Sequence, residues 1–195
     1  MKRAVWLFAA VLPLCAQPRQ LSHAQLDTRS VTGQLEQEFQ ALMRAQPQPA
    51  WIGYSIPASG ADSNECWNGV VHLEGPEEVF LLFRIEAGAI TQIRILAPDC
   101  AVDGGGVSLH WLTGVQPAAS ARWLQALALR TDLNEALRRR AIRALAASKG
   151  PEAVDALVSI ARTQPNSQLG RQAVNALARS RDSRAQAFFE DVLKR

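Results

Sequence analysis

The residue types best suited to chemistry lie in one short stretch, "DCAVDGGGVSLHW", residues 99–111. A phosphate-binding loop would need Lys followed by Ser or Thr after the glycines, and then a helix, but neither follows here. A calcium loop would need several oxygen ligands in a fixed order, and Asp99 and Asp103 supply only two. We therefore expect Gly104 to Gly106 to form a tight turn between two strands.

The N-terminus decides how the cysteines are interpreted. Lys2 and Arg3 precede the uncharged apolar run "AVWLFAAVLPL", which has the length of a signal-peptide core and is shorter than the roughly 20 residues of a membrane span. We expect residues 1–16 to be a signal peptide that ends at Ala16, so that the mature chain is periplasmic or secreted and has no transmembrane segment. A buried N-terminal helix and a lipoprotein anchor at Cys15 are the alternatives.

After cleavage two cysteines remain, Cys66 and Cys100. In an oxidising compartment they most simply form one disulfide, which closes a loop of about 35 residues and is worth about 3.8 kcal/mol in the chain-entropy model. The alternative is a zinc site that adds His72 and His110. Structural zinc sites draw ligands from closely spaced pairs, whereas five and nine residues separate these ligands. A disulfide is therefore expected, with no metal and no cofactor.

The first half of the chain predicts an α+β arrangement, an N-terminal helix plus a small antiparallel sheet. Residues 17–48 are expected to be a linker and an amphipathic helix, because Val31, Leu35, Phe39 and Leu42 recur at helical spacing. Residues 49–116 are expected to be the antiparallel β region, because the apolar period changes to two from Trp51 onwards.

Four segments of that β region predict strands. They are "WIGYSIP", the segment 70–73, the hairpin "EEVFLLFRIEAGAITQIRIL" with a turn at Gly88, and "VSLHWL". In the last segment Val107, Leu109 and Trp111 share one face. His110 then lies on the alternate face, and we expect it to be exposed or half-buried.

Charge divides unevenly between the two halves. Residues 17–116 carry a net −6 and residues 117–195 a net +7, from 14 basic and seven acidic side chains. Arg138, Arg139, Arg140 and Arg143 cluster in one predicted helix, where they form a candidate interaction surface. The alternative is a solvated helix face, because consecutive residues point around a helix.

The second half contains an internal repeat. Residues 137–161, "LRRRAIRALAASKGPEAVDALVSIA", align with residues 169–193, "LGRQAVNALARSRDSRAQAFFEDVL", with eight identities in 25 positions at an offset of 32. Each unit predicts two helices joined by a short turn, and "PAASARWLQALAL" predicts the second helix of an incomplete first unit. A repeat of helix pairs at this period predicts an α-solenoid over residues 117–195.

These repeat motifs resemble HEAT-like repeats, including the short kind of phycobilisome-lyase-type proteins. With the N-terminal signal and the segment "DCAVDGGG", the whole chain is similar to exported bacterial HEAT-repeat proteins of uncharacterised function. The resemblance implies a surface that binds another protein, and no residue matches a lyase-specific position.

The resulting hypothesis is an exported, non-catalytic protein-binding scaffold. One alternative is a basic surface that binds anionic lipid or polymer, while nucleic acid is not expected because no aromatic residue interleaves with the arginines. The other is an enzyme or zinc module that uses the Cys/His set, or an enzyme that uses Asp62, Glu65 and Asp103.

Overall fold

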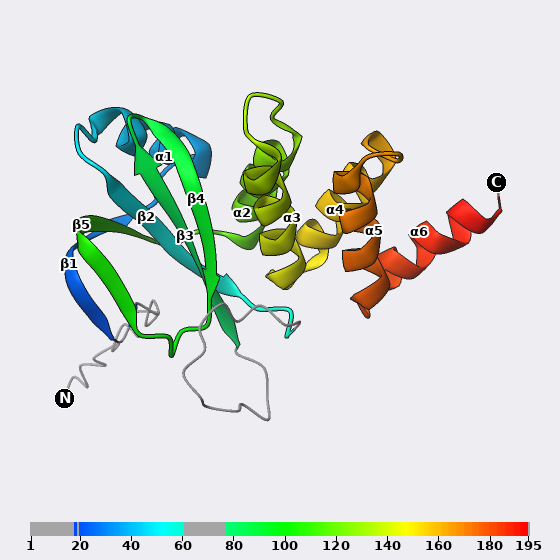
Figure 1. Cartoon of the computed structure of the whole chain (residues 1–195). Helices are drawn as coiled ribbons and strands as arrows, with labels where there is room; N and C mark the ends of the chain where they lie inside the picture. Colours follow the sequence, from blue (N-terminus) through cyan, green and yellow to red (C-terminus); the bar gives the residue numbers. More distant parts are fainter. Residues whose placement is uncertain (1–17, 19, 61–76, 195) are drawn as a thin grey trace, which may run out of the picture.

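A computed structural model describes residue 18 and residues 20–60 and 77–194 of the 195-residue chain. These residues form a five-stranded sheet from which a row of helices leads away to the C-terminus (Figure 1). The strands are β1 (Leu21–Ser30), β2 (Ala50–Pro57), β3 (Glu78–Glu86), β4 (Ala89–Leu96) and β5 (Val102–Thr113). The helices are α1 (Leu35–Ala45), α2 (Pro117–Leu129), α3 (Glu135–Ala147), α4 (Pro151–Thr163), α5 (Gln168–Arg179) and α6 (Ser183–Leu193).

The sheet has the order β1-β5-β2-β3-β4 and is mixed. Strand β5 runs parallel to both of its neighbours, β1 and β2, whereas β3 is antiparallel to β2 and β4. The prediction of an antiparallel sheet is therefore wrong for β5. Helix α1 connects β1 to β2, a crossover that suits parallel strands, and β5 inserts between them. The strand predicted over residues 70–73 lies outside the described residues.

Strand β1 occupies a segment predicted to be a linker. It lies at the edge of the sheet, and only Leu21, Ala24 and Asp27 of its ten residues are even partly buried. Backbone pairing with β5 holds it in place and continues beyond its end, where the Val31 N–H donates to the carbonyl oxygen of Thr113 at 2.9 Å. Helix α1 consequently begins after Val31, and its buried residues are Leu35, Phe39 and Leu42, as its spacing predicted.

The β3–β4 hairpin is confirmed. Its turn residues Ala87 and Gly88 both have positive φ, 49° and 72°, the conformation of the tight hairpin turn that matches strand twist. Both faces of its first strand, β3, are buried. On one face Leu81 and Phe83 join the core under α1, and on the other Phe80 packs edge-on against Trp111 with ring centroids 4.9 Å apart.

The three glycines do not form a turn between strands, because β5 runs through them. Ser22 of β1 pairs with Asp103 and Ala24 pairs with Val107, so the extra residues on β5 form a bulge. Gly105 and Gly106 adopt φ of 63° and 80°, which glycine accepts without strain. The predicted turn is therefore wrong, since the chain absorbs these residues while it keeps pairing with β1.

The predicted helix pairs are confirmed as α3–α4 and α5–α6, with α2 as the partial first unit. Helix α4 contacts α2 on one side and α6 on the other in one row, and α3 and α5 form a second row. Leu145, Leu157 and Ile160 are buried between the helices, and alanines such as Ala144 allow close approach. The result is a short solenoid-like stack (Figure 1).

The sheet closes one end of this stack, where it contacts both α2 and α3. At the end of β2, the Lys149 N–H donates to the carbonyl oxygen of Pro57 at 2.8 Å, and just beyond it the Ser59 hydroxyl donates to the carbonyl oxygen of Ala146 at 2.8 Å. The buried hydroxyls of Tyr54 and Ser120 are 3.0 Å apart and join β2 to α2. One hydrophobic core consequently runs from the sheet into the helices.

Candidate functional site

His110 makes the most unexpected polar contact in the sheet. It is 6 % exposed, so the expectation of an exposed or half-buried side chain is wrong. Its Nδ1 lies 2.9 Å from Oδ2 of Asp27, a carboxylate oxygen that also accepts a 2.8 Å hydrogen bond from Nε of Arg29. Asp27 faces His110 because parallel pairing of β1 with β5 places these two residues opposite each other. No sequence pattern had indicated this pair.

The electrostatics of the pair favour an ionised Asp27. The hydrogen bond from His110 and then that from Arg29 lower the pKa of Asp27 below its ordinary value of 3.8. Nε2 of His110 is buried without a hydrogen-bond partner. A nucleophile–base pair would place a hydroxyl or thiol at this nitrogen, and among the described residues none bonds to it. The contact joins a residue of β1 to a residue of β5.

The other residues of the 99–111 stretch lie apart from this pair. Asp103 accepts a 2.9 Å hydrogen bond from the Gly105 N–H and lies 3.1 Å from Nδ1 of the exposed His23. These two contacts, in that order, lower the pKa of Asp103. Cys100 is buried, with 1 % exposure, between β4 and β5. Within the described part of the chain, no three His, Cys, Asp or Glu side chains gather as a metal site.

Several predicted partners of that stretch lie outside the described residues. They are Cys66 of the expected disulfide, His72 of the alternative zinc set, and the acidic residues Asp62 and Glu65. The Cys66–Cys100 disulfide and the Cys66/His72/Cys100/His110 zinc site therefore remain alternative predictions. Residues 1–16, the expected signal peptide, also lie outside.

The four arginines of α3 reach different surroundings. Nε of Arg138 donates to the carbonyl oxygen of Ala128 at 3.0 Å, near the end of α2. Arg139 reaches across to α5, where its Nε donates to Gln172 at 3.3 Å and its Nη1 to Gln168 at 3.5 Å. Arg143 is exposed, and Arg140 is partly buried. Burial, and then the positive charge of Arg143, lower the pKa of Arg140.

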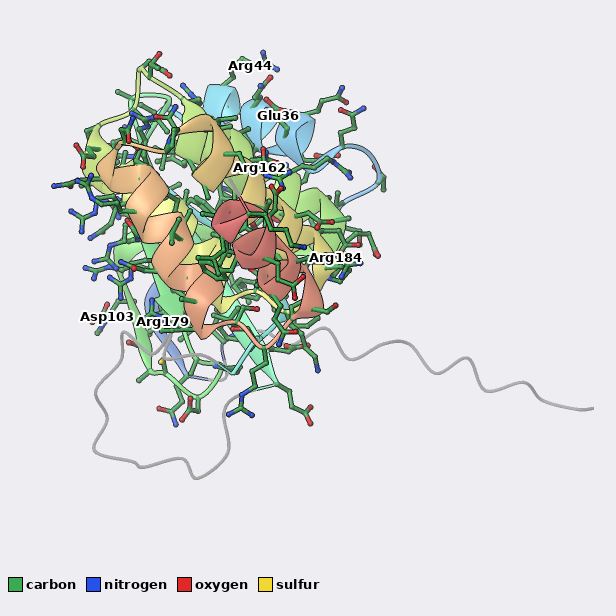
Figure 2. All side chains as sticks on the ribbon, turned by 90° about the vertical axis from the view of Figure 1, so that its right-hand side faces the viewer. Glu36, Arg44, Asp103, Arg162, Arg179 and Arg184 are labelled. Carbon is green, nitrogen blue, oxygen red and sulfur yellow. The ribbon has the colours of Figure 1, made fainter. Side chains whose placement is uncertain are left out.

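The repeat helices differ in charge by row. Helices α3 and α5 together contain six arginines and one acidic residue, Glu135. Helices α2, α4 and α6 together contain three arginines and four acidic residues. In Figure 2, Arg179 lies on the α5 side of the stack, whereas Arg162 and Arg184 lie around α6. The positive charge is therefore concentrated on the α3–α5 row.

Comparison with known families identifies the helical half. Residues 121–195 match the family model described as HEAT repeats. This segment is a HEAT-like repeat array. HEAT-like stacks form extended surfaces that commonly bind other proteins. No curated protein and no solved structure matches the chain. Among the described residues, no helix is long and apolar enough to cross a bilayer.

Proposed function

We propose that this protein is an exported, non-catalytic scaffold that binds another protein through its HEAT-like helices. The observation that carries the proposal is a repeat stack that the sheet closes at α2 and one end of α3, and that presents exposed side chains along α3, α5 and α6. There the outer side chains Arg143, Asn175 and Leu193 are exposed. A surface of this kind suits protein recognition.

Two further observations support the export and the absence of catalysis. The basic residues and apolar run of residues 1–16 have the pattern of a signal peptide. The His110–Asp27 pair, a buried imidazole beside a partly exposed carboxylate, resembles part of a catalytic triad, but Nε2 of His110 bonds to no hydroxyl or thiol among the described residues.

Binding is tested by site-specific photocrosslinking in the cell envelope. A photoreactive residue at exposed Asn175 on α5 should capture a defined envelope protein, and the same residue at exposed Gln37 on α1 serves as the matched control. Capture from Asn175 but not from Gln37 supports the scaffold. Absence of any crosslinked protein along α3 to α6 would overturn it.

Export is tested by mass spectrometry of the N-terminus. Protein recovered from the periplasm or the medium should begin near residue 17. Recovery with the first 16 residues intact, or exclusively from the cytoplasm, would contradict the proposed export.

A further inference from the structure

Arginines in the two rows of the repeat stack have different partners. Arg162 of α4 lies 3.2 Å from Asp191 of α6, and Arg184 of α6 lies 3.4 Å from Asp155 of α4. The row formed by α2, α4 and α6 thus neutralises part of its own charge with internal ion pairs.

The other row presents arginines that lack such pairs. Among the described residues, no acidic side chain lies within ion-pair distance of the four exposed arginines of α3 and α5. We call this set the arginine face: Arg139, Arg143, Arg171 and Arg179. Arg139 and Arg143 are one helical turn apart, and Arg171 occupies the repeat position equivalent to Arg139. The face therefore spans two adjacent helices.

Neighbouring groups hold parts of this face in position. Gln168 and Gln172 accept hydrogen bonds from Arg139, and Nη1 of Arg171 donates to the carbonyl oxygen of Asn166 at 3.2 Å. These bonds restrict the side chains and leave further N–H donors of each guanidinium for another group. A restricted guanidinium loses less entropy when it binds a planar, bidentate acceptor.

We propose that the arginine face binds an acidic segment of a partner protein through its Asp and Glu carboxylates. The inference rests on the proposed scaffold function and specifies the chemistry of its partner. Adjacent packed helices lie about 8–10 Å apart, and an extended peptide advances about 3.3 Å per residue. In an extended segment that crosses α3 and α5, two acidic residues about three positions apart would therefore lie one over each helix.

The composition of the face favours this partner over a membrane or a nucleic acid. The large apolar side chains exposed among the described residues are Leu26, Val192 and Leu193, and none lies on α3 or α5. Helices that bind a membrane surface insert apolar residues from the same side, which these helices do not provide. They also contain no aromatic residue on which a base could stack.

The test measures binding of fluorescently labelled poly-L-glutamate to the purified mature chain. The face variant Arg139→Gln/Arg143→Gln/Arg171→Gln is compared with the control Arg122→Gln/Arg162→Gln/Arg184→Gln, which removes the same charge from α2, α4 and α6. We expect the face variant to bind roughly tenfold more weakly and the control within about threefold of wild type, since each exposed ion pair contributes modestly. Circular dichroism and the thermal midpoint establish that both variants are folded.

A third variant keeps the test informative if either triple variant fails to fold. Arg139→Lys/Arg143→Lys/Arg171→Lys preserves the charge and removes the guanidinium fork. Weaker binding than wild type supports carboxylate recognition by the forks. Binding equal to wild type would show that net positive charge, and not the guanidinium geometry, explains the interaction. That result would overturn the inference.

Other outcomes would also overturn the inference. They are equal losses in the face and control variants, no binding of poly-L-glutamate by wild type, and binding only to vesicles of phosphatidylcholine with phosphatidylglycerol. Self-association of wild type that the face variant abolishes would make a second copy the occupant instead.

Photocrosslinking and poly-L-glutamate binding together distinguish failure of the arginine-face inference from failure of the scaffold proposal. An envelope protein crosslinked equally from Asn175 in wild type and in the face variant would retain the scaffold and overturn the arginine-face inference. Face-dependent binding of poly-L-glutamate without any crosslinked envelope protein would support the chemistry of the face while the scaffold proposal fails.

Discussion

Burying an imidazole among apolar side chains is unfavourable unless its polar atoms find partners. His110 satisfies Nδ1 with Asp27 and leaves Nε2 unbonded. The carboxylate retains access to water, because the Asp27 side chain is 41 % exposed. This pair therefore joins the edge strand β1 to β5 with an interaction that is partly screened by solvent.

Asp27→Asn should lower the free energy of unfolding by about 0.5–1 kcal/mol at neutral pH, a small effect because solvent screens the exposed carboxylate. The pKa of Asp27 is lower in the folded state than its ordinary value of 3.8. The contribution of the Asp27 carboxylate to the free energy of unfolding is therefore complete above pH 3.8. It is lost as the pH falls through the lower pKa of the folded state. Urea unfolding from neutral to acidic pH measures both effects.

The exposed Asp103 supplies a matched control. Asp103→Asn also removes a carboxylate beside a histidine, but both side chains are mostly exposed, 62 % for Asp103 and 75 % for His23. Its effect on stability should be smaller than that of Asp27→Asn. An identical acid dependence in wild type and Asp27→Asn would contradict the assigned role of the pair.

The predicted disulfide between Cys66 and Cys100 has a separate test. If it forms, the double variant Cys66→Ala/Cys100→Ala should lose a typical 2–4 kcal/mol of unfolding free energy. Thermal unfolding should show the same decrease in midpoint with reductant, and no effect of chelator. A decrease caused by chelator alone would replace the disulfide with the alternative zinc site.

At the scale of single elements, glycine positions show where two backbones meet. A methyl group at Gly170 in α5 would collide with the carbonyl oxygen of Gln164, which precedes the helix. The equivalent position in the preceding repeat is Arg138. The glycine is therefore required by the close turn before α5 and not by the helical repeat itself.

Gly170→Ala should be destabilising although alanine favours a helix interior by about 1 kcal/mol. The collision with Gln164 involves backbone, so we expect a net loss of about 1–3 kcal/mol in the free energy of unfolding. Gly33→Ala is the control, because nothing lies within 4 Å of its added methyl group. Denaturant unfolding that shows a stabilised Gly170→Ala protein would be incompatible with this packing.

At the scale of the whole molecule, the sheet and the helices share one hydrophobic core. Phe39 of α1 contacts Phe83 of β3 at a centroid distance of 5.0 Å and Trp123 of α2 at the same distance. Separating the two halves would expose these aromatic side chains to water. The β region is therefore a structural cap of the repeat stack and not an independent neighbour.

Unfolding of the chain should consequently be a single transition. Far-ultraviolet circular dichroism reports mainly the helices, and tryptophan fluorescence also reports the sheet through Trp51 and Trp111. Both signals should change at one temperature. Tyr54→Phe removes the Tyr54–Ser120 hydrogen bond and should lower both midpoints together by a few degrees. Separate midpoints would show that the halves unfold independently.

The sequence by itself determined the elements whose evidence is local. The spacing of Leu35, Phe39 and Leu42 identified the buried side of α1, and two apolar runs of strand length around Gly88 identified the β3–β4 hairpin. The offset of 32 residues identified the helix pairs. These signals are periods or turns within one segment, or the similarity of two neighbouring segments, so no knowledge of a distant partner is needed.

Only the tertiary structure decided how strand β5 is used. Its insertion between β1 and β2, its parallel direction and its pairing through Gly104 to Gly106 all depend on distant backbone groups. The pairing of Asp27 with His110 followed from that register. The distribution of arginines between rows of the stack likewise emerged only when α3 and α5 were placed side by side. Backbone hydrogen bonds between strands are nearly independent of side-chain type, so a polar edge strand such as β1 leaves no apolar period to detect.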